Sequence, residues 1–304
     1  MLRSCFIALA MIGSMSGVAA QSLSAELRKK SEDEIRSVLA SSSSLNGLAA
    51  IDLTTGDGFF FNESSVFPQG SAIKIPVLME VYKQAKEGKF QLSDRREIKS
   101  KELVGGTGIL KDFDYPASLP IGNLAVLMIT LSDNVATNNL IDLVGMQRIN
   151  KTLSDLGMVA TRIQRPMMDL AAAARGSENT SSPLEAVRIL ALLYNGKFSD
   201  EETALDVINV LKKNSRENSR LAAGIPVNVS MAFKTGVLPG VSTEWAIIYL
   251  PGRPYAVSAM QTYRVPGEED LVLERVSKIL YQYFWRIENA SKLGNYIDRS
   301  VLRK

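Results

Sequence analysis

The stretch FPQGSAIK, residues 67–74, places Ser71 three residues before Lys74 and directly ahead of the apolar run IPVLMEVY at 75–82. In a helix that begins here, the two side chains would lie one turn apart. The stretch is therefore either the polar start of a helix or a nucleophile with its base. The chain of 304 residues contains no histidine, which excludes a Ser-His-Asp triad. If Ser71 is a nucleophile, another kind of side chain must take its proton.

Two further short motifs follow, S-D-N at 132–134 and K-T-G at 234–236. Each is weak evidence alone, because serine and aspartate often cap helices and short motifs recur by chance. Together they are specific. They occur in this order on a predicted helix start, a loop between helices and a strand, so only the fold can bring them together. The set of three is typical of β-lactamases and penicillin-binding proteins.

The likeness extends beyond the motifs to residues 45–262, which resemble the class A serine β-lactamase family. It is carried by LAAIDLTTGDGFFFN at 48–62, GGTGIL at 105–110 and MITLSDNVATNNLIDLVG at 128–145. The resemblance implies an α/β fold of the α+β type, in which terminal helices flank an antiparallel sheet and a helical lobe completes the active-site cleft.

The residue pattern gives the same order of elements. Two strands joined at a glycine turn come first, a helical middle follows, and three β-rich runs come between residue 227 and residue 263. Because short turns favour antiparallel pairing, the early and late strands are expected to form one sheet. Amphipathic spacing predicts helices at 23–40, 75–86, 123–131, 134–144, 183–195, 201–213 and 270–288.

Residues 1–20 are predicted to be a secretory signal, with Arg3 before an apolar stretch and small residues before Gln21. The rest, 21–304, is expected to be one catalytic domain. Its α/β lobe would comprise about 21–70 and 215–304 and its helical lobe about 71–214. The predicted location is secreted or periplasmic, without stable membrane insertion.

Composition limits the possible partners. The only cysteine, Cys5, lies in the predicted signal, and without cysteine or histidine the usual zinc and copper ligand sets are missing. We therefore expect no metal and no other cofactor. The net charge is +3 and no basic block is interleaved with aromatic residues, so no nucleic-acid partner is expected. A monomer acting on a small β-lactam or a cell-wall peptide is the predicted state.

The resemblance also implies roles for the motif residues. Ser71 would attack an acyl carbonyl, and Lys74 would accept its proton if burial or a second cation lowers the lysine pKa. Lys234 could be that cation and could attract a substrate carboxylate. Ser132 would pass a proton to the leaving nitrogen. Asn134 would bind the substrate's side-chain amide.

The strand that carries K-T-G is expected to bind substrate through Thr235, Gly236 and Val237. By resemblance, the backbone N–H groups of Ser71 and Val237 form the oxyanion hole. Family members often place an arginine for the substrate carboxylate on the next strand, but Ser242, Thr243 and Glu244 stand there. Some members supply the guanidinium from before K-T-G, and Arg220 is the candidate in this chain.

The clearest departure from the family lies after the S-D-N region. Class A β-lactamases carry a glutamate there, in an E-x-x-L-N pattern, which positions the water that breaks the acyl-enzyme. Counting along TRIQRPMMDLA at 161–171 puts Met167 at the glutamate and Ala171 at the asparagine. A thioether cannot accept a proton from water. The nearest carboxylates are Asp169 and Glu178, which are interpreted first as loop or cap residues.

Three functions follow from these residues. The first is an exported serine hydrolase that opens a β-lactam amide through an acyl-enzyme on Ser71. The second is a penicillin-binding-like D,D-peptidase or esterase in which deacylation is slow, which the missing glutamate favours. The third is a binding or sensor module that is acylated once and holds its ligand. The intact set of Ser71, Lys74, Ser132 and Lys234 argues against the loss of all catalysis.

Overall fold

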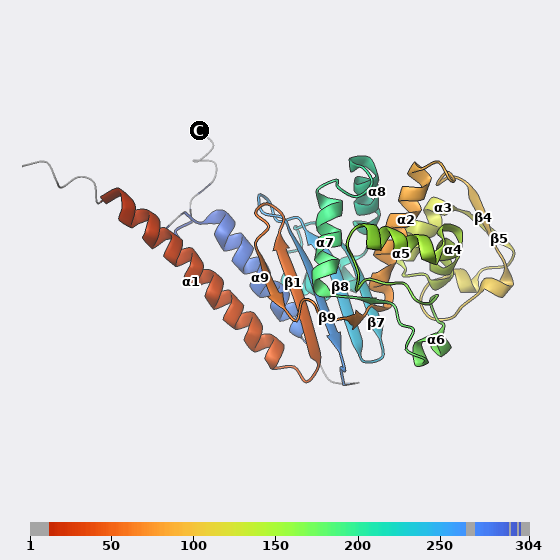
Figure 1. Ribbon diagram of the computed structural model, residues 1–304, viewed down its shortest axis with the longest axis horizontal. Helices are drawn as coiled ribbons and strands as arrows, with labels where there is room; N and C mark the ends of the chain where they lie inside the picture. Colours follow the sequence, from red (N-terminus) through yellow and green to blue (C-terminus); the bar gives the residue numbers. More distant parts are fainter. Residues whose placement is uncertain (1–11, 266–270, 292, 297, 299–304) are drawn as a thin grey trace, which may run out of the picture.

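One five-stranded antiparallel sheet organises the chain, with strand order β2-β1-β9-β8-β7. The computed structural model describes residues 12–265, 271–291, 293–296 and 298. The five strands are β1 (Leu45–Asp52), β2 (Gly58–Phe61), β7 (Met231–Leu238), β8 (Val241–Ile248) and β9 (Tyr255–Thr262). Because β1 pairs along its whole length with β9, the early and late strands meet as predicted (Figure 1).

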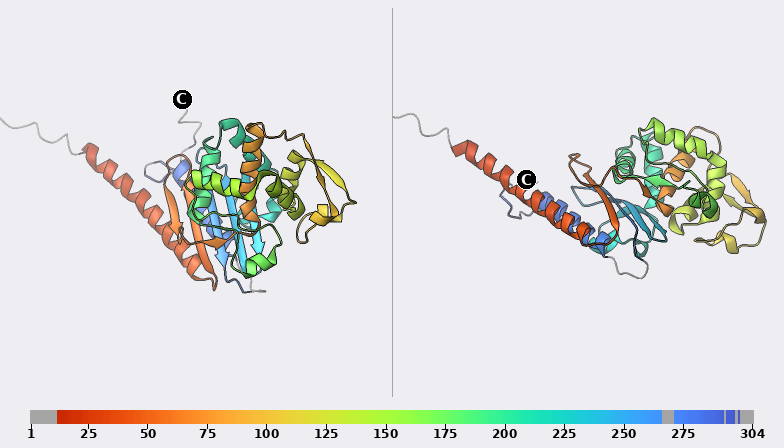
Figure 2. Two further views of the ribbon diagram at one scale, coloured as in Figure 1. Left: turned by 45° about the vertical axis from the view of Figure 1, so that its right-hand side comes forward. Right: turned by 60° about the horizontal axis from the view of Figure 1, so that its bottom comes forward.

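The two terminal helices, α1 (Ile12–Ala40) and α9 (Val272–Asn289), pack side by side on one face of the sheet (Figure 2). Their buried side chains, such as Ile35 and Leu280, join the apolar side chains on that face of the sheet in one core cluster. The prediction of flanking terminal helices is confirmed. The first helix is longer than predicted, since it begins at Ile12 rather than Leu23.

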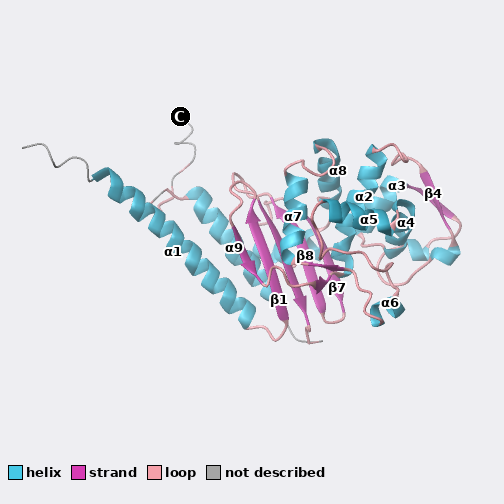
Figure 3. Cartoon of the chain, in the orientation of Figure 1, coloured by secondary structure: helices cyan, strands magenta, loops and turns pink. Residues whose placement is uncertain are grey.

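The other face of the sheet carries the middle of the chain, which is mainly helical (Figure 3). Its helix α2 is central, because residues 74–81 are all buried. The helices there are α2 (Lys74–Lys86), α3 (Ile121–Thr130), α4 (Asn134–Val144), α5 (Met146–Asp155), α6 (Leu170–Ala174), α7 (Pro183–Tyr194) and α8 (Glu201–Leu211). Two small two-stranded sheets accompany them, β3 (Phe67–Pro68) with β6 (Thr180–Ser181), and β4 (Arg95–Ile98) with β5 (Ala117–Pro120).

The sequence pattern missed α5 and α6, and the division into lobes at residues 71 and 214 stays a prediction. Helix α7 packs against β1, β8 and β9, so the helical middle shares a core with the sheet. Local chemistry explains where its helices start. Ser182 caps α7 with Pro183 in the first turn, and Asp133 caps α4, as expected for residues whose oxygens accept free backbone N–H groups.

A close backbone contact between Gly236 and Gln69, called the junction below, joins the sheet to the turn that carries Ser71. A Cβ atom added at Gly236 would lie 2.0 Å from the carbonyl oxygen of Gln69, so only glycine allows this approach. The Thr243 hydroxyl donates to that same carbonyl at 2.8 Å, and Trp245 Nε1 donates to the Gln69 side chain at 2.9 Å. Strands β7 and β8 therefore fix the backbone immediately before Ser71.

Within the described residues, no helix combines the length and the apolar character that a membrane span requires. Residues 1–11, which include Cys5 and most of the predicted secretory signal, lie outside the described residues.

Replacing Gly236 by alanine should destabilise the protein, because the new methyl group meets backbone atoms of Gln69 and Ala72 in the Ser71 turn and the Thr243 hydroxyl on β8. We expect a loss of about 1–3 kcal/mol, typical of overpacking, measured by urea unfolding followed by circular dichroism. Gly105→Ala is the matched control, since a Cβ atom at Gly105 has no neighbour within 4 Å. Equal stability of the two variants would contradict the junction described above.

Candidate active site

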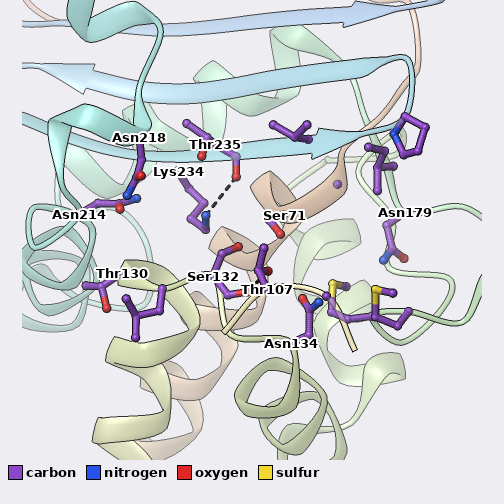
Figure 4. Close-up of a pocket in the computed structure, with 18 of the residues that line it drawn as sticks. Ser71, Thr107, Thr130, Ser132, Asn134, Asn179, Asn214, Asn218, Lys234 and Thr235 are labelled. Carbon is purple, nitrogen blue, oxygen red and sulfur yellow. Dashed lines mark hydrogen bonds between the residues drawn. The ribbon is translucent and has the colours of Figure 1, made fainter. Parts of the chain in front are cut away.

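The three sequence motifs meet in one cleft of about 740 Å³ between β7 and the helical part of the chain (Figure 4). Ser71, Ser132, Asn134, Lys234, Thr235 and Val237 line it. Ser71 lies on the short 3-10 turn Gly70–Ile73 that leads into α2, Ser132 lies between α3 and α4, and Lys234 lies on β7. These are the three contexts expected from the sequence.

Lys74 is completely buried at the start of α2. Its Nζ donates to the Ser132 carbonyl oxygen at 2.7 Å and to Asn134 Oδ1 at 3.0 Å, and it lies 3.1 Å from Ser132 Oγ. In Figure 4, the Ser71 side chain lies beside Lys234 and Ser132, with Asn134 below it. A neutral amine donates two hydrogen bonds, so two carbonyl-type oxygens leave its lone pair available to a hydroxyl proton.

Burial lowers the pKa of Lys74 well below its ordinary value, and the nearby positive charge of Lys234 lowers it further, while Asp133 opposes the shift. Burial also lowers the pKa of Lys234, to about 8, against the raising effect of Glu244. Both shifts have the same cause, since a low dielectric disfavours the ammonium form. The predicted condition for Lys74 to act as a base is met by this arrangement.

The S-D-N turn is held in an uncommon backbone conformation. Ser132 has a φ of 52°, in the left-handed region that non-glycine residues seldom adopt. Asp133 stabilises the turn, because its carboxylate accepts the N–H groups of Ile109 at 2.7 Å and Leu110 at 2.9 Å while it caps α4. A Cβ atom at Gly108 would lie 2.3 Å from this carboxylate. The segment GGTGIL is therefore needed to fix Ser132.

Thr107 is a site residue that the sequence analysis did not single out. Its hydroxyl donates to the Ser132 carbonyl oxygen at 2.7 Å, its own carbonyl accepts the Asn134 N–H at 3.1 Å, and it lines the cleft. The family likeness of residues 105–110 was the signal that could have identified it.

The K-T-G strand presents its residues in different ways. Lys234 is nearly buried and its Nζ donates to the Thr235 carbonyl at 3.1 Å, whereas Val237 is exposed. Gly236 makes the junction beneath Ser71 rather than lining the cleft. Opposite Thr235 on β8 lies Glu244, and burial raises the pKa of its carboxyl to about 7.

Arg220 is not among the residues that line the cleft in the described part of the chain. Its backbone N–H donates to Glu244 at 3.1 Å, and its side chain is half-buried. Its role as a carboxylate ligand stays a prediction.

The segment from 161 to 179 forms the opposite wall. Met167 is anchored by Asn138, which accepts the Met167 N–H at 2.7 Å and donates to its carbonyl at 3.1 Å. Met167 and Met168 both line the cleft, and Met168 is 40% exposed. The position at which the family's glutamate was expected thus presents a thioether to the cleft.

The two nearest carboxylates have structural contacts. Asp169 caps α6 through the Ala172 N–H at 2.9 Å. Glu178 pairs with the buried Arg165 at 2.8 Å and accepts the Asn179 N–H at 2.7 Å. Neither lines the cleft, and no aspartate or glutamate appears among the described residues that do. Nor do the described residues contain a group of three or more acidic, cysteine or histidine side chains suited to a metal ion.

Comparison with known sequences finds a matching family and several relatives. A sequence model described as the beta-lactamase enzyme family matches residues 30–284. The imipenem-hydrolyzing beta-lactamase of Enterobacter cloacae is 24% identical over 258 residues, which cover 82% of this chain and 88% of that protein. Beta-lactamase CTX-M-8 of Citrobacter amalonaticus is 27% identical over 210 residues, or 68% of this chain and 72% of that protein.

Solved structures share the fold. The beta-lactamase from Sphaerobacter thermophilus superposes with a TM-score of 0.77 at 24% identity, covering 84% of this chain and 97% of that one. PBP-A superposes with the same TM-score and identity, covering 84% and 96%. The family resemblance and the fold class predicted from the sequence are both confirmed.

Proposed function

The chain belongs to the beta-lactamase enzyme family, and we propose that it is a serine hydrolase in which Ser71 attacks the amide carbonyl of a β-lactam. One observation carries this proposal. Lys74, one helical turn from Ser71, is buried with a lowered pKa and contacts Ser132 and Asn134. A lysine whose pKa is lowered by burial is a better general base than an ordinary surface lysine, which is almost fully protonated near neutral pH.

Acylation follows from these positions. Lys74 takes the Ser71 hydroxyl proton as the Ser71 Oγ–carbon bond forms. The carbonyl oxygen becomes an oxyanion, which the backbone N–H groups of Ser71 and Val237 would stabilise by about 3 kcal/mol each. The ring C–N bond then breaks as Ser132 gives its proton to the nitrogen and recovers one from Lys74. The product is an ester on Ser71.

Substrate binding would use the rest of the cleft. Lys234 supplies positive charge and Thr235 a hydroxyl for an anionic group, and Asn134 offers its amide to the acyl side chain. Gly236 acts through the junction with the Ser71 turn, because a larger residue would displace the nucleophile.

Hydrolysis of the ester needs a base that activates water, and this is where the chain differs from its β-lactamase relatives. Met167 stands at the expected position, and Asp169 and Glu178 are held in a helix cap and an ion pair. We therefore propose that the acyl-enzyme is long-lived. The same observation supports a second candidate, a penicillin-binding-like D,D-peptidase or esterase whose physiological substrate is a cell-wall peptide or another acyl donor. A module that stays acylated as a sensor is the third.

The test is an intact-mass time course with a penicillin. The natural chain should gain one acyl group that persists for hours, and Ser71→Ala should gain none. In Met167→Glu/Ala171→Asn, the adduct lifetime should fall at least tenfold, since a positioned general base typically contributes about 100-fold or more.

Met167→Gln/Ala171→Asn is the matched control, because glutamine has the shape of glutamate without its basicity, and its adduct should persist. Rapid loss of the natural adduct would contradict slow deacylation and favour efficient β-lactam hydrolysis. Acylation of Ser71→Ala would contradict the assignment of the nucleophile.

We also propose that the protein is exported, on the basis of the signal-like composition of residues 1–20. In a bacterial host, the mature protein should be recovered outside the cytoplasm with a mass that corresponds to a chain beginning at Gln21. An exclusively cytoplasmic protein that retains residues 1–20 would contradict export.

A further inference from the structure

The turn between α8 and β7, residues 214–221, closes the end of the cleft next to Lys234. Asn214 and Asn218 both line the cleft. Figure 4 shows them side by side at the end where Lys234 lies, whereas Asn179 lies at the opposite end. Neither asparagine belongs to the three sequence motifs, so the cleft has a polar end that the motif residues do not account for.

Two charged side chains fix this turn from both directions. Before Asn218, the Arg216 guanidinium donates to the carbonyl oxygens of Val229 at 2.7 Å and Ile225 at 2.8 Å. After Asn218, the carboxylate of Glu244 accepts the Ser219 hydroxyl and the N–H groups of Arg220 and Leu221, the latter two at 3.1 and 3.4 Å. The backbone that carries Asn218 is therefore held on each side by groups that do not themselves line the cleft.

Asn218 is exposed, and its side-chain amide makes no hydrogen bond within the described part of the chain. Asn214 differs, since it is buried and donates to the Phe233 carbonyl at 3.3 Å. A polar side chain that is rigidly carried, unpartnered and directed at a cleft is suited to a ligand. Of the two asparagines, Asn218 is the one whose donors are available.

The strand fixes which part of a substrate this end would meet. Going from Thr235 back to Lys234, β7 runs toward Asn218 (Figure 4), and therefore away from Val237, which follows Thr235 on the same strand. When the scissile carbonyl lies at Val237, the leaving nitrogen faces Ser132, and the group attached to that nitrogen extends toward Lys234. In penicillins that group bears a carboxylate.

We propose that Asn218 donates a hydrogen bond to the substrate carboxylate beside Lys234 and Thr235, and that Glu244 is a positioning residue that holds the turn in place. This proposal rests on acylation of Ser71 as proposed above. Lys234 supplies the positive charge that attracts the carboxylate. The amide N–H of Asn218 orients the carboxylate through a hydrogen bond, which is stronger than one between neutral groups because the acceptor is charged. Glu244, which together with Ser242 and Thr243 stands where the family often has an arginine, contributes indirectly through Ser219.

The experiment compares acylation rates of Ser71 by a penicillin and by its methyl ester, measured by intact mass. Asn218→Ala should slow acylation by the free acid about tenfold, the usual effect of one hydrogen bond to a charged group, and acylation by the ester less than twofold. Arg220→Ala is the competing variant. It removes the carboxylate ligand that was expected from the sequence, so it shows whether the guanidinium acts instead of Asn218 or in addition to it.

A selective loss in Arg220→Ala without one in Asn218→Ala would overturn the proposal in favour of the guanidinium. Equal losses on both probes in Asn218→Ala would overturn it as well. If neither probe acylates the natural chain, the proposed function fails first and this inference fails with it, which is a distinct result.

The role of Glu244 needs a double-mutant cycle. Glu244→Gln should also slow acylation by the free acid more than acylation by the ester. In the Asn218→Ala background, the same substitution should cause no further loss of rate that is specific to the free acid. If Glu244→Gln slows acylation by the free acid just as much when Asn218 is already alanine, Glu244 acts on the carboxylate by another route. If Glu244→Gln lowers both acylation rates equally, the role of Glu244 is only structural.

Discussion

Burial of the Lys74 amine is the constraint on which the rest of the site depends. A fully buried lysine is unfavourable unless its nitrogen has hydrogen-bond partners, and the Ser132 carbonyl and Asn134 side chain supply them. The Ser132 carbonyl points inward because the turn adopts a left-handed conformation, which Asp133 and the glycine-rich segment 105–110 stabilise. The same burial, with Lys234 nearby, lowers the pKa that makes the lysine a base. Burial of Lys74 thus costs stability, and the same burial gives the amine the lowered pKa that a base requires.

The second constraint is close packing of backbone at Gly236. It lets β7 approach the Gln69 carbonyl, so the N–H groups of Ser71 and Val237 come from two segments that this close approach brings together. Side chains from β8 also hold the segments that border the cleft. Thr243 and Trp245 hold Gln69, while Glu244 holds the turn that carries Asn218. One strand that contributes no residue to the cleft lining therefore supports both the Ser71 turn and the Asn218 turn.

The sequence predicted what depends on residue type and local spacing. It placed Ser71, Ser132 and Lys234 on the right kinds of element, and it singled out Met167, which lines the cleft. It missed α5, a ten-residue helix in which only Met146, Ile149 and Leu153 are apolar, although their spacing is helical. It also missed Thr107 and Asn218, since their positions depend on hydrogen bonds between segments far apart in the chain, such as Thr107 with Ser132 and Ser219 with Glu244. Composition and periodicity contain no record of such contacts.

The most direct test of the account is the pKa of Lys74, measured by NMR titration of lysine-labelled protein and assigned with Lys74→Met. Burial and Lys234 predict titration well below the ordinary lysine value of 10.5, and a higher pKa for Lys74 in Lys234→Met. Because the unfolded chain then binds more protons, stability should rise with pH between the lowered pKa and 10.5. A Lys74 pKa at or above its ordinary value would mean that the amine is charged near neutral pH, which would contradict its role as the base for Ser71.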